Sequence, residues 1–527
     1  MAKFSNTTTE NQGKRTPIST VKGKTVTHEG GKAYKFDEKS ELFLLAITNM
    51  VGENTFYEKA GKKDDRFVKL IHSVTKSDPA WVQRFIPYLR NTMNMRSASI
   101  VVAAEYVAAG GPVARQVVSS AMSRADEPAE FLAYWAQNHY GWDGASYPLP
   151  APKLPQAVRK GIGDAASRLY KERSALKYNG LSRGVSMGNV LDLVHPKPND
   201  EHQSALYKFL VDRHHGNETS LEGLDIIGEF QRLNSLPMDQ RRAVLETPEV
   251  LRNAGFTWES LSGWLGGPMD AKAWEAMIEA GMGYMALLRN LRNFDEAKIS
   301  KKHKDLVIAK LTNPEEVASS RQFPFRFYSA YKAAPSLTWG PALEEALDLS
   351  VKNIPEFAGR TEILVDLSGS MGATVSAHST VQNWEVGAVF GASLAYGQDL
   401  DNVTFVGFGT NSAEIALPKG GSVLKAVQAV DKVFRSGHLG YGTNIWQAIS
   451  QHHNGHDRVV IFTDMQTHDS PVAGKKIKTI HAFDLGGYGR TPFKTTKGGR
   501  YHYGGYSDAT MTMMKALEQH QSAEWPF

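Results

Sequence analysis

The sequence contains no cysteine among its 527 residues. This absence excludes disulfide bonds, thiolate zinc sites and cysteine nucleophiles, and it fits a reducing compartment. No run approaches eighteen consecutive apolar residues, and the polar, basic first 35 residues hold no apolar segment of the kind found in a secretion signal. We therefore expect a cytoplasmic protein that does not span a membrane.

A large charge of one sign is also absent, since the formal net charge is only +5. Such a balance does not by itself require a polyanionic partner. One segment departs from it, because residues 155–184 hold two acidic residues and seven basic ones, namely Arg159, Lys160, Arg168, Lys171, Arg173, Lys177 and Arg183. This segment is a candidate RNA-binding surface, although an isolated basic stretch is more often the solvated face of a helix.

Three parts of different character follow one another along the chain. Residues 1–27 are polar and basic, which predicts a flexible arm. Residues 28–354 carry apolar residues at helical spacing between breakers such as Asp78-Pro79 and Asn313-Pro314, and no run alternates for long enough to predict a sheet. We expect an all-α array of stacked helix pairs there. Residues 355–527 alternate strands with helices, which predicts a doubly wound α/β domain.

Oxygen-bearing side chains follow three segments of this α/β domain. Asp366, Ser368 and Ser370 come directly after the strand 363–365, Thr443 precedes a helix, and Asp464 ends the strand 459–462. Open α/β sheets bind ligands at the carboxyl ends of their strands. Carboxylates and hydroxyls are the ligands that Mg²⁺ or Mn²⁺ prefers. Because much of this shell is neutral hydroxyl, we expect a cation that keeps positive charge and an open position.

This combination resembles a von Willebrand factor A domain with its metal-ion-dependent adhesion site. The resemblance implies that Ser368, Ser370 and Thr443 contact the cation directly. It also implies that Asp366 and Asp464 contact it, often through water. Four nearby histidines lack the company of a zinc site, and we interpret them as surface residues: His452, His453, His456 and His468.

The helical part resembles a second family. Four phrases carry this resemblance, namely 28–34 (HEGGKAY), 192–198 (DLVHPKP), 285–291 (MALLRNL) and 323–326 (FPFR). Together with the A domain, their order is similar to the Ro autoantigen family and its TROVE module, over residues 28–527. Members of that family are rings of HEAT-like helical repeats closed by the A domain. They bind Y RNA on the outer surface and single-stranded ends of misfolded RNA in the central hole.

The resemblance also implies particular RNA-binding residues. Lys177-Tyr178 and His195-Pro196 match a Lys-Tyr pair and a later His-Pro of the family, and Arg183 stands near the position of its arginine. Asn179-Gly180 replaces the family's basic continuation at this point. Lys171 and Arg173 extend the candidate set. For His195 a role in packing is an equal alternative, because a lone histidine beside an apolar helix is often a core residue.

Three functions are compatible with these features. The first is a noncoding RNA-binding scaffold for RNA quality control or processing, which acts as a monomer and recruits a nuclease or other protein through the metal site. The second is a metal-dependent protein-interaction module on a helical scaffold without RNA binding. The third, a hydrolase, is disfavoured because the sequence has no P-loop, nucleophile elbow or His-Glu-x-x-His motif. We therefore expect no catalytic residues.

Overall fold

The computed structural model describes residues 21–48, 52–143, 154–179, 184–351, 354, 356–377, 379–471, 477–494 and 499–504, with Met511, Met514, Glu518, Trp525 and Phe527. These residues form two compact units. Unit 1 takes in the described residues up to Val74, Gln322–Ser329 and Glu344–Phe527. Unit 2 takes in Thr75–Arg321 and Ala330–Leu343.

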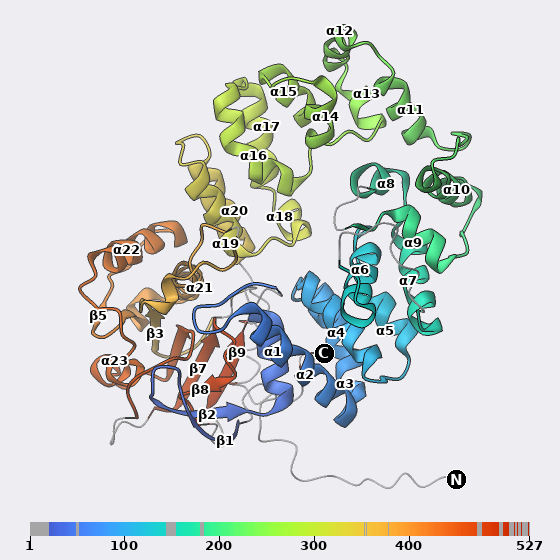
Figure 1. Ribbon diagram of the computed structural model, residues 1–527. Helices are drawn as coiled ribbons and strands as arrows, with labels where there is room; N and C mark the ends of the chain where they lie inside the picture. Colours follow the sequence, from blue (N-terminus) through green and yellow to red (C-terminus); the bar gives the residue numbers. More distant parts are fainter. Residues whose placement is uncertain are drawn as a thin grey trace, which may run out of the picture. The chain divides into compact units, whose positions relative to one another are not determined.

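Unit 2 is helical wherever it is described, as the sequence predicts (Figure 1). Breakers in the sequence mark where helices begin. The Asp78 side chain accepts a hydrogen bond from the Trp81 N–H, and Asn313 accepts from two backbone N–H groups of the following turn. These side chains satisfy donors that a helix start leaves without partners.

The helices of unit 2 are α3 (Pro79–Asn91), α4 (Arg96–Ala108), α5 (Ala114–Ser120), α6 (Glu127–Tyr140), α7 (Gln156–Leu169), α8 (Glu172–Tyr178), α9 (Met187–Val194), α10 (Glu201–His215), α11 (Asp225–Asn234), α12 (Met238–Arg241), the 3₁₀ helix η3 (Arg242–Glu246), α13 (Pro248–Asn253), α14 (Trp258–Leu265), α15 (Ala271–Glu279), α16 (Tyr284–Ala297), α17 (Lys301–Leu311) and α18 (Pro314–Ser320). The chain passes between the units along α2 (Ala60–Ser77), α19 (Pro324–Ala333) and α20 (Gly340–Ser350). Large aromatic side chains such as Trp81, Phe131 and Phe294 are fully buried between these helices. Each such burial stabilises the fold by roughly 1.5–3 kcal/mol.

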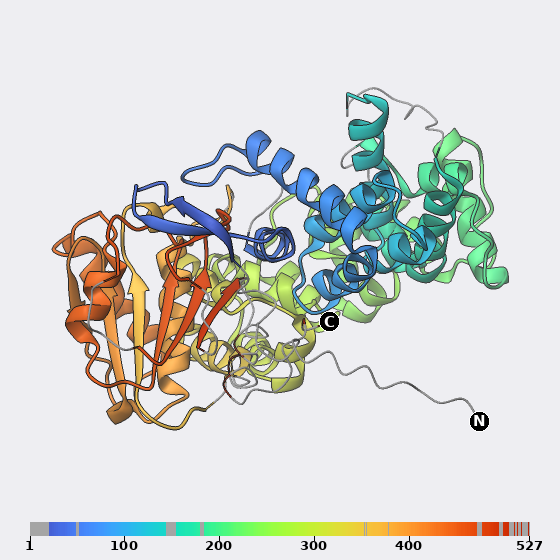
Figure 2. The same cartoon turned by 90° about the horizontal axis from the view of Figure 1, so that it is seen from below.

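Unit 1 is built on a six-stranded sheet in the order β5-β4-β3-β6-β7-β9, parallel except for the short β5. Its strands are β3 (Thr361–Asp366), β4 (Val403–Phe408), β5 (Ser412–Glu414), β6 (Arg458–Thr463), β7 (Thr479–Asp484) and β9 (Arg500–Gly504). Its helices are α1 (Glu38–Thr48), η4 (Ser370–Gly372), α21 (Asn383–Tyr396), η5 (Leu400–Asn402), α22 (Val423–Ser436) and α23 (Ile445–His452). Helices cover the sheet on both sides (Figure 2).

The central strands are buried on both faces, which is why their sequences read as continuous apolar runs. On one face α21 lies close to the sheet, because Gly387 and Gly391 bring its backbone near Val365. On the other face Ile445 and Ile449 of α23 belong to the core cluster of Leu364 and Ile461. The parallel register places the ends of β3 and β6, Asp366 and Thr463, at one edge. This architecture confirms the predicted fold class of helical repeats plus a doubly wound A domain.

The N-terminal part differs from the prediction. Residues 21–26 form strand β1 rather than a flexible arm, and β1 pairs with β2 (Lys32–Phe36). β2 in turn pairs with β8 (Arg490–Thr491), so a second sheet ties the start of the chain to the A domain. These strands are short and mostly exposed, so they lack the alternation that a sheet prediction needs. Residues 1–20 lie outside the described part.

The structure also changes the expected boundary between the helical part and the A domain. Residues 28–74 belong with the A domain in unit 1 and not with the helical array. The change from helices to alternating strands still falls where the sequence places it, between α20 and β3. Among the described residues, no helix combines the length and the hydropathy that crossing a membrane requires.

Candidate functional site

The first group of predicted metal ligands follows β3. Asp366 is fully buried and accepts hydrogen bonds from the Ser368 N–H (2.9 Å) and from the Thr463 hydroxyl (2.6 Å). The Ser368 and Ser370 hydroxyl oxygens lie 3.3 Å apart, and both residues are buried. This loop therefore gathers one carboxylate and two hydroxyls beyond the strand end.

Hydrogen bonds join this loop to the other two loops. The Gly369 N–H donates to the carbonyl of Tyr441 (2.9 Å), beside the buried Thr443. The Thr443 carbonyl accepts from the His468 N–H (2.9 Å) on the loop that follows β6. The same loop begins with Asp464 and Met465, whose left-handed φ of 64° marks a strained turn. The three predicted loops are thus held against one another.

The electrostatics of the site fit a cation. Burial raises the pKa of Asp366 to about 6, and burial together with the nearby Asp366 raises the pKa of Asp464 well above its usual range. Asp464 Oδ2 is buried without a hydrogen-bond partner in the described structure. A buried, unpaired carboxylate oxygen is costly, and a hard divalent cation would satisfy it. Asp366, Ser368, Ser370, Thr443 and Asp464 therefore form a donor set that Mg²⁺ or Mn²⁺ would accept.

Two residues beside this site, Tyr57 and His28, were not predicted as part of it. Tyr57 interacts with the Ser370 hydroxyl and lies near Asp464, and its own hydroxyl donates to Glu29. The amide N–H of His28 donates to Gln466 Oε1 (2.8 Å). Tyr57 stands alone in a loop and belongs to no motif, so only the tertiary structure brings it here. A hint lay in the phrase 28–34, which already resembles a family signature.

Two of the four histidines are not surface residues as predicted, whereas His468 is exposed and His452 is half-buried. His453 and His456 are buried beside Glu362 of β3, with His453 Nδ1 3.0 Å from a Glu362 oxygen. Burial lowers the pKa of His456 to about 4, so this ring is neutral near pH 7. The interpretation failed because the partner carboxylate lies 91 residues upstream of His453, on a separate strand.

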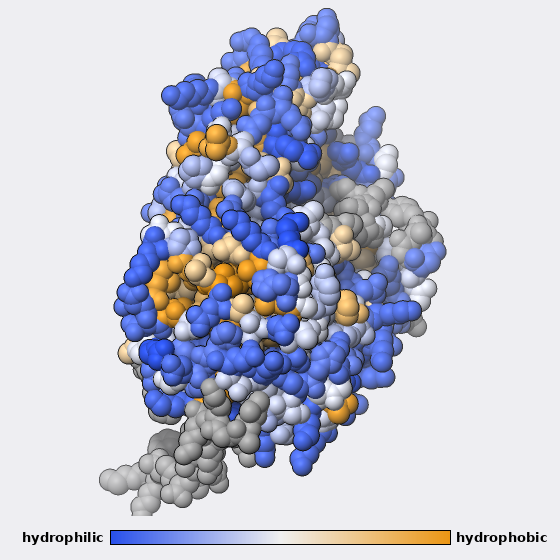
Figure 3. All heavy atoms as spheres, turned by 90° about the vertical axis from the view of Figure 1, so that its left-hand side faces the viewer, coloured by the Kyte–Doolittle hydropathy of each residue, from blue (hydrophilic) through white to orange (hydrophobic). Residues whose placement is uncertain are grey.

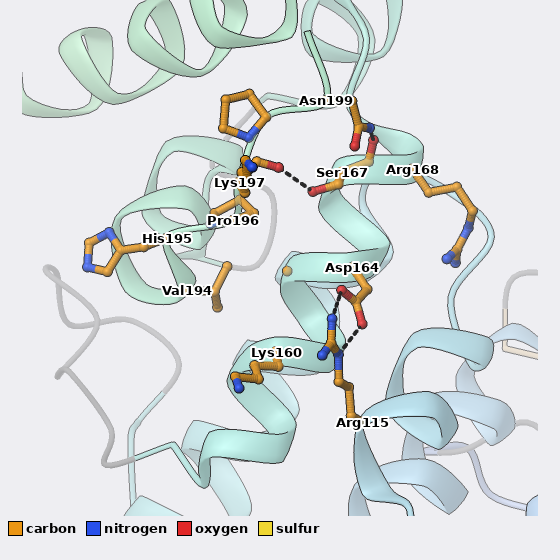
Figure 4. A pocket seen from close by; sticks show the side chains of 12 residues that line it. Arg115, Lys160, Asp164, Ser167, Arg168, Val194, His195, Pro196, Lys197 and Asn199 are labelled. Carbon is orange, nitrogen blue, oxygen red and sulfur yellow. Dashed lines mark hydrogen bonds and ion pairs between the residues drawn. The ribbon is translucent and has the colours of Figure 1, made fainter.

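A second candidate site lies in unit 2, between α7 and the turn from α9 to α10. It is a cavity of about 750 Å³ whose lining includes four cationic side chains, one carboxylate and one histidine: Arg115, Lys160, Arg168, Lys197, Asp164 and His195. Gly161 allows this arrangement, because a Cβ there would lie only 2.6 Å from the Arg115 carbonyl of α5. α5 and α7 therefore pack closely enough for Arg115 to reach Asp164 (Figure 4).

A neighbouring cavity of about 490 Å³ shares Ser167, Arg168 and Asn199 with the first. Lys171 and Arg173 line it, together with the carboxyl-bearing Glu172 and Asp200. We call the two cavities together the basic groove. It runs beside the segment that the sequence identifies as rich in basic residues.

The two acidic residues of that segment are already bound by other protein groups, and they neutralise only part of the charge of the groove. Asp164 makes two hydrogen bonds to Arg115, of 2.7 and 2.8 Å, and the Arg115 side chain holds the pKa of Asp164 below its usual value. Glu172 is buried and accepts a hydrogen bond from the Ile227 N–H, at the start of α11. Arg168 donates to Ser119 and to the Met122 carbonyl, which are neutral acceptors. Positive charge therefore remains for an outside anion.

The structure places the predicted RNA-binding residues as follows. His195 is exposed at the end of α9, so the alternative role in packing is wrong (Figure 4). Its left-handed φ of 46° turns the chain toward the groove. Lys171 and Arg173 are exposed in the groove, and Lys177 lies outside it over the Tyr178 ring, at 5.2 Å from the centroid. Arg183 lies outside the described residues.

Arg124 was missed by the sequence reasoning. Its guanidinium lies 5.2 Å from the centroid of the same Tyr178 ring, so two cations flank one aromatic side chain.

The face that carries α22 and α23 has a different character from the basic groove. Figure 3 shows that hydrophobic residues gather there within a mainly hydrophilic surface. The basic groove is therefore the surface best suited to a polyanion.

Comparison with known proteins identifies part of unit 2. The TROVE domain family matches residues 255–340. The chain is similar to telomerase protein component 1 of Mus musculus (41% identity over 85 residues) and of Rattus norvegicus (38% over 109 residues). These matches cover 15% and 19% of this chain, but only 3% and 4% of the length of those relatives.

A solved structure extends the likeness to almost the whole chain. The Ro (RSR) protein of Deinococcus radiodurans matches with a TM-score of 0.59 and 17% identity, over 91% of this chain and 98% of that one. At this identity the match concerns the fold, and it agrees with helical repeats followed by an A domain. The fold and the match of residues 255–340 to the TROVE domain both agree with the resemblance found in the sequence.

Proposed function

We propose that this protein is a scaffold for noncoding RNA, with no catalysis of its own. A structured, Y RNA-like RNA binds the basic groove, and single-stranded 3′ ends of misfolded RNA enter a cavity of the helical part. The protein acts in RNA quality control or processing in the cytoplasm. The observation that carries this proposal is the groove itself, with four cationic side chains against one carboxylate in its larger cavity.

The chemistry of the groove supports RNA as the ligand. Lysine and arginine contact phosphates, and each contact releases counterions, so that affinity falls as salt rises. Tyr178, flanked by Arg124 and Lys177, supplies an aromatic face on which an unpaired base can stack. A basic groove with an aromatic neighbour suits a nucleic acid, because its phosphates and its bases can both be bound.

We further propose that the A domain binds Mg²⁺ or Mn²⁺ through the five residues predicted from the sequence. The unpaired Asp464 Oδ2 supports this proposal. A bound cation supplies an electropositive centre, which can hold a carboxylate. The alternative of a metal-dependent protein-interaction module without RNA binding has the same support from the A domain, but it leaves the basic groove without a role.

The test is RNA binding by fluorescence anisotropy at two salt concentrations. The probes are a structured RNA with a single-stranded 3′ tail and the same RNA without it. The wild type is compared with the double variant Lys160→Ala/Lys197→Ala, with Lys177→Ala, and with Lys302→Ala as the control. Lys302 is an equally exposed lysine on α17 that pairs with Glu279.

We expect salt-sensitive binding in the wild type and in the control. We expect the double variant to lose affinity and to reduce the slope of log affinity against log salt by about two, one for each phosphate contact. Tighter binding of the tailed RNA would support the separate site for single-stranded ends. Absence of binding to either RNA at low salt would exclude the proposal and leave the protein-interaction module.

A further inference from the structure

The turn between β1 and β2 lies against the metal-site loop that follows β6 and begins with Asp464. The Thr27 hydroxyl donates to the carbonyl of Thr467 (2.6 Å), and the Gly31 N–H donates to the same carbonyl (3.1 Å). A Cβ at Gly31 would lie 2.2 Å from that oxygen, so the close approach requires glycine. Because Thr467 is only three residues from Asp464, the turn is fixed beside the candidate cation position.

Aromatic packing fixes Tyr57 in the same place. Its ring stacks on His28, with centroids 5.0 Å apart and an interplanar angle of 6°, and it meets the edge of Tyr488 at 5.3 Å. This packing directs the Tyr57 hydroxyl to the Ser370 hydroxyl on one side and to the Glu29 carboxylate on the other. One phenolic oxygen therefore connects a predicted metal ligand with Glu29.

The second oxygen of Glu29 is also held. His468 Nε2 lies 3.0 Å from Glu29 Oε2, and His468 Nδ1 lies 3.1 Å from the Glu29 carbonyl. The backbone N–H of His468 donates to Thr443, another predicted ligand. Glu29 is thus connected to the metal-site loops from two directions, and its side chain is only about one quarter exposed.

We propose that the chain closes its own metal site: Glu29 is the carboxylate that faces the bound cation, with Tyr57 holding it in place. The cation then holds the turn between β1 and β2, together with Tyr57, onto the A domain. This proposal rests on the proposed binding of Mg²⁺ or Mn²⁺, and it gives the open position an occupant from within the chain. A carboxylate tethered so close has a high effective concentration, so a partner's carboxylate must displace it.

Charge explains why such a clasp would depend on the cation. Asp366 and Asp464 are two buried carboxyl groups, and Glu29 is connected to their loops through Tyr57 and His468. A divalent cation held by the two aspartates would attract the Glu29 carboxylate, and this attraction is missing without the cation. The turn should therefore be held more firmly when the cation is bound.

The test uses the full chain and Mn²⁺ alone, titrated by calorimetry after chelation. The variants are Glu29→Gln and Tyr57→Phe. Glu38→Gln is the matched control, since Glu38 is an exposed carboxylate of the same segment that bonds only to Ser73. We expect Glu29→Gln to weaken Mn²⁺ binding about tenfold, Tyr57→Phe to weaken it less, and the control to match the wild type.

Hydrogen exchange of the His28 and Gly31 amides provides the second readout. We expect Mn²⁺ to slow their exchange in the wild type and in Glu38→Gln, and to have little effect in Glu29→Gln. Wild-type affinity in Glu29→Gln, with no protection of these amides by Mn²⁺, would overturn the clasp while leaving the metal site intact. Absence of Mn²⁺ binding by the wild type would overturn the proposed metal function, and the clasp with it.

Discussion

The basic groove of unit 2 and the metal site of unit 1 differ in how far their polar side chains are exposed to solvent. In the groove, Lys160, Lys197 and His195 are exposed, and the nearby acidic residues are already engaged. In the metal site, the five predicted ligands are buried, and residues from the start of the chain cover them. The groove is thus ready for a large external ligand. The metal site suits one small ion, and Tyr57 and Glu29 lie beside its loops.

The largest effect should come from removing a buried ligand of the metal site. We expect Asp464→Ala to lower the affinity for Mn²⁺ more than about 100-fold, since it removes a carboxylate and leaves its partners without an ion. RNA binding by the groove should not change. Calorimetry and anisotropy measure the two effects on one preparation. Loss of RNA binding in this variant would show that the two sites are coupled and would contradict their independence.

Removing the carboxylate of the larger cavity should strengthen RNA binding. Asp164→Asn frees Arg115 from its two hydrogen bonds to a charged partner. We expect RNA affinity to rise about three- to tenfold at low salt and the gain to shrink at high salt, as for a phosphate contact. Anisotropy titrations measure both values. Weaker binding would mean that Asp164 positions Arg115 rather than neutralising it.

The A domain should lose stability in acid through a buried histidine. Burial lowers the pKa of His502 to about 3, against an ordinary value near 6.5, so the folded state holds this ring neutral while the unfolded chain binds a proton. The contribution of His502 is therefore complete above pH 6.5 and is lost as the pH falls. Between pH 7 and 5 the loss amounts to about 2 kcal/mol.

Chemical denaturation of the wild type and of His502→Gln measures this loss. The difference in the free energy of unfolding between the two proteins should shrink as the pH falls from 7 to 5. A constant difference would show that the pKa of His502 in the folded protein equals its pKa in the unfolded chain. Glutamine keeps a side chain that can bond to Thr491, the present partner of the ring.

The smallest effect is expected at His195, where one substitution should change stability and RNA affinity in opposite directions. A non-glycine residue in the left-handed conformation at the end of a helix carries strain, and glycine is the usual residue there. We expect His195→Gly to raise the free energy of unfolding by up to about 1 kcal/mol while RNA binding weakens. Thermal denaturation measures the stability of the variant, and anisotropy measures its RNA affinity. Unchanged RNA affinity would limit His195 to a structural role.

The sequence predicts what is encoded in local order. Each strand and helix found by periodicity between 361 and 484 is present, and Asp366 and Asp464 follow the strands as expected. Chain order suffices there, because parallel strands place their carboxyl ends at one edge. The basic segment could also be found, since composition reveals it.

The residues that the sequence missed depend on distant partners. Tyr57 meets Ser370 from more than three hundred residues away, and His453 meets Glu362 on a strand that is apolar at nearly every other position. A single sequence holds no signal for such pairs. The same is true of β2, which pairs with β8 through Tyr34 and Lys35.

The pairing of β2 with β8 can form only late in the synthesis of the chain. β2 leaves the ribosome early, but its second partner lies more than 400 residues further along the chain. At about 5–20 residues per second, the N-terminal segment waits roughly 20–90 s before β8 exists. During that interval β2 lacks its partner β8. The sheet of β1, β2 and β8 can therefore be completed only late in synthesis, and a protein truncated before β8 would lack this link between β2 and the A domain.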